Sequence, residues 1–182
     1  MGGAWRVFPW DPAAKPGEPF SPSYIYPHQG SGRFDLAGKL VVYLGETAVH
    51  AVAEKLQRFR GQRVDRKDLI ESGKTLALVE CQLGTIKLAD LCDPKVLVRY
   101  GLAPDVLASR DVTKTQRVAA ALYKEGYEGL RWWSALSGDW HTIVVFDGKI
   151  DCGKPEPLTI AHQAVQDASV VLGIRLSAPS RG

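Results

Sequence analysis

The sequence has few of the residues that mark metal-binding or disulfide-rich proteins. Among its 182 residues there are three cysteines, four histidines and one methionine. The cysteines form no CxxC pair, and no histidine stands at a metal-ligand spacing from them, so we expect no metal site. The odd, widely separated set of Cys81, Cys92 and Cys152 is typical of reduced thiols in a cytosolic protein.

Targeting and membrane-spanning segments are also lacking. The first residues, MGGAWRVFPW, contain no cationic region followed by an apolar one, and Arg6 stands where a myristoylation signal requires Ser or Thr. No apolar run approaches the length that spans a bilayer. We therefore expect a cytoplasmic protein that makes no membrane contact.

The chain has little excess charge of either sign. It carries 23 basic and 20 acidic residues, which gives a net charge of +3. This small positive charge is compatible with an anionic ligand but does not indicate nucleic-acid binding. Its most basic segment, residues 58–67, contains Asp65 and a single aromatic residue, Phe59, and Asp68 follows it. This mixture favours a solvated linker. A non-enzymatic basic binding module is the alternative, and we expect no direct contact with nucleic acid.

The pattern of apolar residues predicts one compact α+β domain over residues 1–182, with small mixed sheets and surrounding helices. Thr47 is the expected N-cap of one helix, and Asp111 or Thr113 that of another, which Gly126 ends. We expect helices at 46–60, 111–126 and in LTIAHQAVQDASVV, and strands in WRVF, at 39–44, 75–83 and 86–91, and in GLRWWS and HTIVVFDG.

The stretch SGRFDLAGKLVVYLGETAVHAVAE combines a cation, an aromatic ring and a carboxylate: Arg33, Tyr43 and Glu54. If the helix turns back along its strand, Glu54 lies level with Tyr43, and both can face one cavity. In the alternative interpretation, Glu54 lies on a solvated face with His50 and Arg58 and pairs with Arg58 at i,i+4.

The segment EGYEGLRWWSALSGDWHTIVVFDG places Ser134 and Ser137 between a tryptophan pair and a strand. A Ser-His-Asp hydrolase would need His141 together with Asp139 or Asp147. The chain has no GxSxG elbow, and these residues are too close in sequence for the usual placement of a triad. The hydrolase interpretation is therefore disfavoured.

The ordered set WRVF, GRF, VVYLGET, AVAE, LADLCDP, TQRVAAALYKEGYEGLRWWS and VVFD resembles the RES-domain family. The resemblance covers residues 4–148 and leaves 149–182 as a C-terminal extension. It implies a fold related to ADP-ribosyltransferase toxins and NAD as the substrate. Characterised members break the nicotinamide–ribose bond by hydrolysis or phosphorolysis, and many are toxins paired with Xre-type antitoxins.

The same resemblance assigns the family arginine, tyrosine, glutamate and serine to Arg33, Tyr43, Glu54 and Ser134. The sequence departs from the family at Phe34, where Trp or Tyr is common. Two tryptophans, Trp132 and Trp133, precede the serine, and Ser137 competes with Ser134 for its role.

These residue types suit the implied reaction. Nicotinamide leaves a cationic ring as a neutral molecule, so one carboxylate, Glu54, can stabilise the oxocarbenium charge without a general acid. The guanidinium of Arg33 suits the NAD pyrophosphate, and Gly30 and Gly32 would let the backbone approach the phosphates. Tyr43 offers a face for nicotinamide, and Ser134 a hydroxyl for its carboxamide or for a phosphate.

We therefore predict an NAD+ glycohydrolase or phosphorylase that uses NAD+ as substrate and needs no cofactor or metal. A mono-ADP-ribosyltransferase that modifies a protein is the alternative, because it would use the same site. Phosphorolysis needs a second anion site, for which His50 and Arg58 are the candidates. The resemblance further implies an Xre-type antitoxin as partner and suggests a homodimer.

Overall fold

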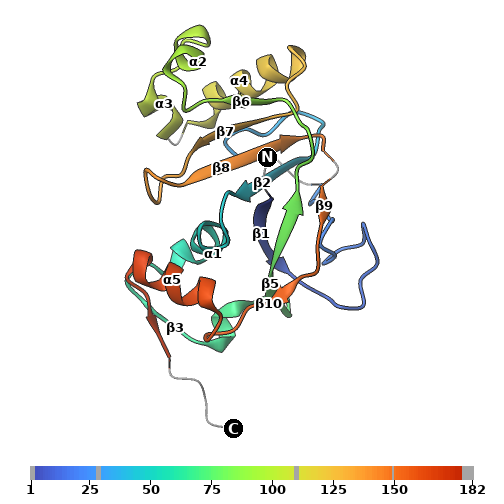
Figure 1. Ribbon diagram of the computed structural model, residues 1–182, viewed down its shortest axis with the longest axis vertical. Coiled ribbons are helices and arrows are strands. Elements are labelled where there is room, and N and C mark those ends of the chain that lie inside the picture. Colours follow the sequence, from blue (N-terminus) through green and yellow to red (C-terminus); the bar gives the residue numbers. More distant parts are fainter. Residues whose placement is uncertain (1–2, 28–29, 109–110, 149, 178–182) are drawn as a thin grey trace. The chain divides into compact units, whose positions relative to one another are not determined.

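The computed structural model describes residues 3–27, 30–108, 111–148 and 150–177 (Figure 1). The chain divides into two compact units, each assembled from several segments. Ile25–Leu44 and Leu83–Lys149 belong to the first unit. Gly2–Tyr24, Gly45–Gln82 and Ile150–Gly182 belong to the second.

The first unit is built on a mixed set of strands in the order β2-β8-β7-β6. Strand β7 pairs antiparallel with β8 and parallel with β6. Helices α2, α3 and α4 lie together beside these strands (Figure 1). The elements are β2 (Val41–Gly45), β6 (Leu88–Asp90), α2 (Pro94–Arg99), α3 (Pro104–Ala108), α4 (Val112–Lys124), β7 (Gly129–Trp133) and β8 (His141–Phe146).

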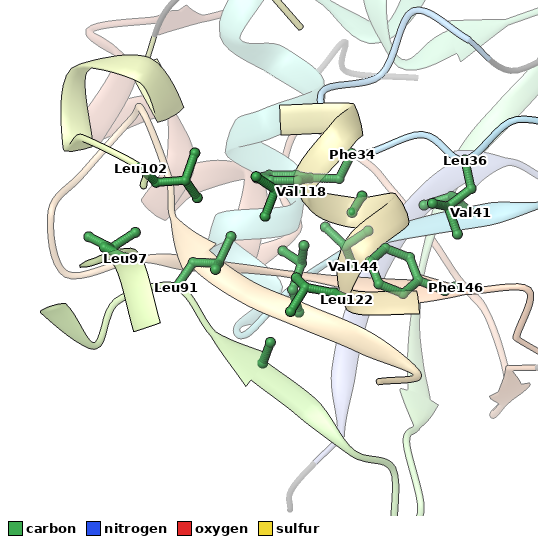
Figure 2. Close-up of a cluster of buried hydrophobic side chains, with 13 residues drawn as sticks. Phe34, Leu36, Val41, Leu91, Leu97, Leu102, Val118, Leu122, Val144 and Phe146 are labelled. Carbon is green, nitrogen blue, oxygen red and sulfur yellow. The ribbon is translucent and has the colours of Figure 1, made fainter. Parts of the chain in front are cut away.

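Helix α4 closes the core of the first unit. Asp111 caps it by accepting the N–H of Thr113, and Gly126, at φ +78°, follows its C-terminal end, both as predicted. Its buried face repeats at the spacing of an amphipathic helix and comprises Thr115, Val118, Ala119 and Leu122. Figure 2 shows Val118 and Leu122 of this face packed with residues of the strands and with Phe34, which is fully buried. The residue that follows Arg33 is thus anchored in the core.

The second unit is built around strand β5, which pairs antiparallel with β1, β4, β9 and β10. Helices α1 and α5 pack against each other, and α1 also packs on β1 and β5. A short parallel pair joins β3 to β11. The elements are β1 (Ala4–Pro9), α1 (Ala48–Leu56), β3 (Arg63–Val64), β4 (Ile70–Glu71), β5 (Lys74–Gln82), β9 (Asp151–Cys152), β10 (Glu156–Pro157), α5 (Gln163–Leu172) and β11 (Arg175–Leu176).

Helix α1 begins where the sequence predicts. The side chain of Thr47 accepts the N–H of His50 at 3.1 Å and caps the helix. The α-helical part ends at Leu56, and a 3-10 turn, Gln57–Phe59, replaces the last predicted turn. The first turn of α1 lies close to Gly45. A Cβ atom built on Gly45 would be 2.8 Å from the backbone nitrogen of Ala51.

The mixed α+β fold class is confirmed, and most predicted elements are present with shifts of one or two residues at their ends. The basic segment 58–67 contains β3 and leads into a short 3-10 turn, Arg66–Leu69. Asp65 and Asp68 form a capping box around this turn, so both carboxylates act locally. Of the predicted extension 149–182, residues 149 and 178–182 lie outside the described residues.

Within the described part of the chain, no helix combines the length and the apolar character needed to cross a bilayer.

The prediction of three reduced thiols is wrong. Cys81 and Cys152 form a disulfide that joins β5 to β9, where the two residues are partners in the strand register. A separation of 71 residues conceals this neighbourhood in the sequence. Disulfides are rare in cytosolic proteins, so the pairing removes one support for a cytoplasmic location, which stays a prediction. Cys92 lies outside this bond and is half-buried.

We predict that reduction of this disulfide destabilises the protein by about 2–4 kcal/mol, because it releases a long loop in the unfolded chain. Urea unfolding with and without a reductant measures the difference. The double variant Cys81→Ala/Cys152→Ala should be insensitive to reductant, whereas Cys92→Ala should respond as the wild type does. Three titratable thiols in denatured, unreduced protein would contradict the pairing.

Candidate functional site

The two units carry different parts of the predicted site. Arg33, Tyr43 and Ser134 belong to the first unit, and Glu54, His50 and Arg58 to the second. The contacts within each unit define how its own side chains are held.

Arg33 lies in a short segment, residues 30–35, which we call the arginine loop. Its guanidinium carbon is 5.3 Å from the centre of a Trp132 ring, a cation–π contact. Its backbone carbonyl accepts a hydrogen bond from the buried hydroxyl of Thr115 on α4. The ring of Phe34 also meets Trp132, edge to face, at 5.3 Å between centroids. Both the backbone and the side chain at Arg33 are therefore placed by neighbours.

Two backbone amides of the arginine loop converge on Asp35, a residue that sequence reasoning missed. One oxygen of this buried carboxylate accepts the N–H groups of Gly30, at 2.7 Å, and Gly32, at 2.8 Å. A Cβ atom on Gly32 would clash with the Asp35 carboxylate and the Tyr43 hydroxyl. Glycine at position 32 thus makes room for these two side chains, whereas the sequence suggested room for a phosphate.

Tyr43 is tied to the arginine loop through its hydroxyl. The hydroxyl donates to the other Asp35 oxygen at 2.8 Å and accepts the N–H of Phe34 at 2.9 Å. Its half-buried ring packs against the apolar cluster of the first unit. Burial, reinforced by the bond to Asp35, raises the pKa of Tyr43 well above its usual value near 10. The phenol is therefore neutral, which suits a ring that binds by its face.

Ser134 is buried at the end of β7, in the turn that leads to β8. Its N–H donates to the carbonyl of Trp140 at 2.7 Å, and its hydroxyl accepts the N–H of Leu136 at 3.1 Å. These bonds fix the turn. Of the two acidic residues that the hydrolase interpretation names, Asp147 forms an ion pair with Lys39 at 2.7 Å.

Glu54 stands on α1 with its side chain 37% exposed. One carboxylate oxygen lies 3.2 Å from Nε2 of His50, one helical turn earlier, and the other accepts from the amide of Gln57 at 3.0 Å. The His50 side chain is almost completely buried. The carboxylate is thus accessible and at the same time oriented through both of its oxygens.

The pairing of Glu54 with Arg58, which the alternative interpretation expected, is replaced by other contacts. Arg58 lies over the ring of Phe59 and 3.6 Å from Glu71, a carboxylate that also binds Lys55 at 2.7 Å. The local reason is the change from α-helix to a 3-10 turn after Leu56, which alters the i,i+4 spacing.

No group of three or more His, Cys, Asp and Glu side chains in the described residues is arranged to hold a metal ion. The first unit holds a guanidinium and aromatic faces, and the second holds the partly exposed Glu54 carboxylate. A guanidinium suits an anionic ligand, and an aromatic face suits a planar ring.

Comparison with known proteins places the chain in a family. The model of the RES domain matches residues 4–166, so the chain belongs to the RES-domain family. The match extends beyond residue 148, where the resemblance in the sequence ended. No curated protein matches the chain.

A solved structure has the same fold. The chain is similar to one in the crystal structure of the M. tuberculosis MbcT–MbcA toxin–antitoxin complex, with a TM-score of 0.64 and 17% identity. The alignment covers 96% of this chain and 88% of that chain. At this identity, the likeness concerns the fold.

We predict that Tyr43→Phe weakens the dependence of the free energy of unfolding on pH above pH 10. With its pKa raised in the folded state, the Tyr43 phenol stabilises the fold fully below pH 10, and this contribution falls as the pH rises further. Above pH 10 the wild type should lose up to about 1.4 kcal/mol per pH unit more than Tyr43→Phe. Urea unfolding from pH 9 to 11 measures both slopes, and equal slopes would contradict the buried phenol.

Proposed function

We propose that this chain is an NAD+-consuming enzyme that breaks the nicotinamide–ribose bond and acts as the toxin of a toxin–antitoxin pair. The observation that carries the proposal is the RES-domain match over residues 4–166. The chemistry of the residues that the family pattern selects supports it.

We assign to Glu54 the role of stabilising the positive charge that develops at the reacting carbon of the ribose. As the bond to nicotinamide breaks, its electron pair leaves with the neutral base, and positive charge develops on the ribose ring. A carboxylate held by His50 and Gln57 needs no reorganisation to face that charge. In hydrolysis, the oxygen of water then bonds to the ribose carbon, and the proton of water is released.

The side chains of the first unit supply binding. The planar guanidinium of Arg33 suits two oxygens of the pyrophosphate, and its contact with Trp132 restricts its orientation. Tyr43 would offer the face of a neutral ring to nicotinamide. Ser134, whose hydroxyl accepts the N–H of Leu136, would offer that hydroxyl to the carboxamide or to a phosphate.

Three acceptors are compatible with this site: water, phosphate and a protein side chain. For phosphorolysis, Arg58 is the more accessible anion ligand, with its side chain 49% exposed, whereas His50 is buried against Glu54. A mono-ADP-ribosyltransferase is the alternative function. Mass spectrometry of the products distinguishes ADP-ribose, ADP-ribose-1″-phosphate and a modified protein.

Membership of the RES-domain family also bears on the protein partner of this chain. The similar structure is that of a toxin–antitoxin complex, which supports an antitoxin for this chain as well. We propose an Xre-type protein, encoded beside this chain, as that antitoxin. A homodimer, as the family resemblance implies, belongs to the same proposal.

We predict that Glu54→Gln lowers the rate of NAD+ loss about 100-fold or more, because the amide cannot stabilise the developing positive charge. The rate is measured on purified protein by loss of NAD+ and release of nicotinamide, with and without phosphate.

Glu71→Gln is the matched control for that substitution. It removes a carboxylate of the same unit that binds Lys55 and Arg58. Its rate without phosphate should stay near that of the wild type. A Glu54→Gln enzyme with an unchanged rate would exclude the assigned role, and a wild type that leaves NAD+ intact would exclude the proposed activity.

We predict that expression of the chain without its antitoxin arrests bacterial growth and lowers cellular NAD+, because the enzyme consumes a shared cofactor. Coexpression of the neighbouring helix-turn-helix protein should restore growth, and Glu54→Gln should be harmless at equal expression. Growth that is unaffected by the wild-type chain would contradict the toxin role while leaving the enzyme assay to decide the activity.

A further inference from the structure

We infer that Asp35 is a positioning residue for the substrate: it holds the arginine loop and the Tyr43 ring in the geometry that binds NAD+. The inference rests on the proposed function, since it takes Arg33 and Tyr43 to be the groups that contact NAD+. Asp35 itself acts through these two residues.

The carboxylate of Asp35 is buried and surrounded by donors. The residue is 7% exposed, and one of its oxygens accepts two amide N–H groups, from Gly30 and Gly32. Its second oxygen accepts the hydroxyl proton of Tyr43 at 2.8 Å. Burial of a carboxylate costs free energy unless hydrogen-bond donors satisfy its oxygens. The three donors therefore act as one network around Asp35.

Helix α4 binds the backbone carbonyl groups of the arginine loop. The side-chain amide of Gln116 donates to the carbonyls of Gly30, at 3.0 Å, and Gly32, at 2.8 Å. The hydroxyl of Thr115 donates to the carbonyl of Arg33. The N–H groups of Gly30 and Gly32 therefore bind Asp35, and the carbonyl groups of Gly30, Gly32 and Arg33 bind side chains of α4.

This arrangement fixes Arg33 between two held neighbours. On one side, Gly32 is bound through both its N–H and its carbonyl; on the other, the N–H of Phe34 donates to the Tyr43 hydroxyl. A glycine-containing loop without these bonds would have to be ordered when the ligand binds, at a cost in conformational entropy. The Asp35 network provides that order in advance.

The network also determines the state of Tyr43. Its proton is directed to Asp35, and the N–H of Phe34 occupies an acceptor position of its oxygen. The hydroxyl is therefore engaged with the loop, and the ring is what Tyr43 can present to a ligand. Loss of the Asp35 carboxylate would remove hydrogen bonds from the loop and from Tyr43 at the same time.

The test is steady-state NAD+ consumption by the full chain with Asp35→Ala and Asp35→Asn. Asp35→Ala should raise KM for NAD+ about tenfold or more with a smaller change in kcat, because it removes the order that binding uses. Asp35→Asn should lie between Asp35→Ala and the wild type, since its amide oxygen can still accept both glycine N–H groups. Asp147→Asn, which removes the carboxylate that binds Lys39, is the matched control with an unchanged KM.

Amide hydrogen exchange supplies a readout that is independent of activity. The N–H groups of Gly30, Gly32 and Phe34 should exchange faster in the Asp35 variants, with those of β7 unchanged in Asp35→Asn. An active enzyme whose KM is the same in both Asp35 variants, or that loses kcat and thermal stability without a change in KM, would overturn the positioning role. A wild-type chain that does not consume NAD+ would instead overturn the proposed function, while faster exchange at these amides would still report the network.

Discussion

The hydrogen bonds that converge on the Asp35 carboxylate are the constraint on which the arginine-bearing part of the molecule depends. This buried group must be satisfied by donors, and the donors are amides of the loop and the hydroxyl of a strand residue, Tyr43. Phe34, packed in the core, and Thr115, on α4, tie the same loop to the rest of the unit. A segment rich in glycine and serine is thereby given one conformation.

The carboxylates of Asp35 and Glu54 have opposite environments. Asp35 is buried and bound by three donors, which makes it a fixed part of the structure. Glu54 is partly exposed on α1 and is oriented by His50 and Gln57. A polar group can bind a ligand while it remains accessible, and supporting groups around it are best buried. This difference in burial agrees with the roles that we propose, in which Glu54 contacts the substrate and Asp35 supports the residues that bind it.

Local patterns in the sequence predicted most of the elements but few of the contacts. The caps at Thr47 and Asp111 were predictable because a side chain there bonds an amide two or three residues away. Asp35 was missed because its partners include Tyr43, a residue of the next strand, and carboxylates in loops are common.

The bond between Cys81 and Cys152 could not be predicted for a related reason. Strand pairing brings together residues that are far apart in the chain. Gly45 lies close to α1, and this contact links β2 to the position of the helix. Any side chain at position 45 would press on the backbone of Ala51, so the helix itself would have to yield. Glu54, one turn further on, would be carried with it.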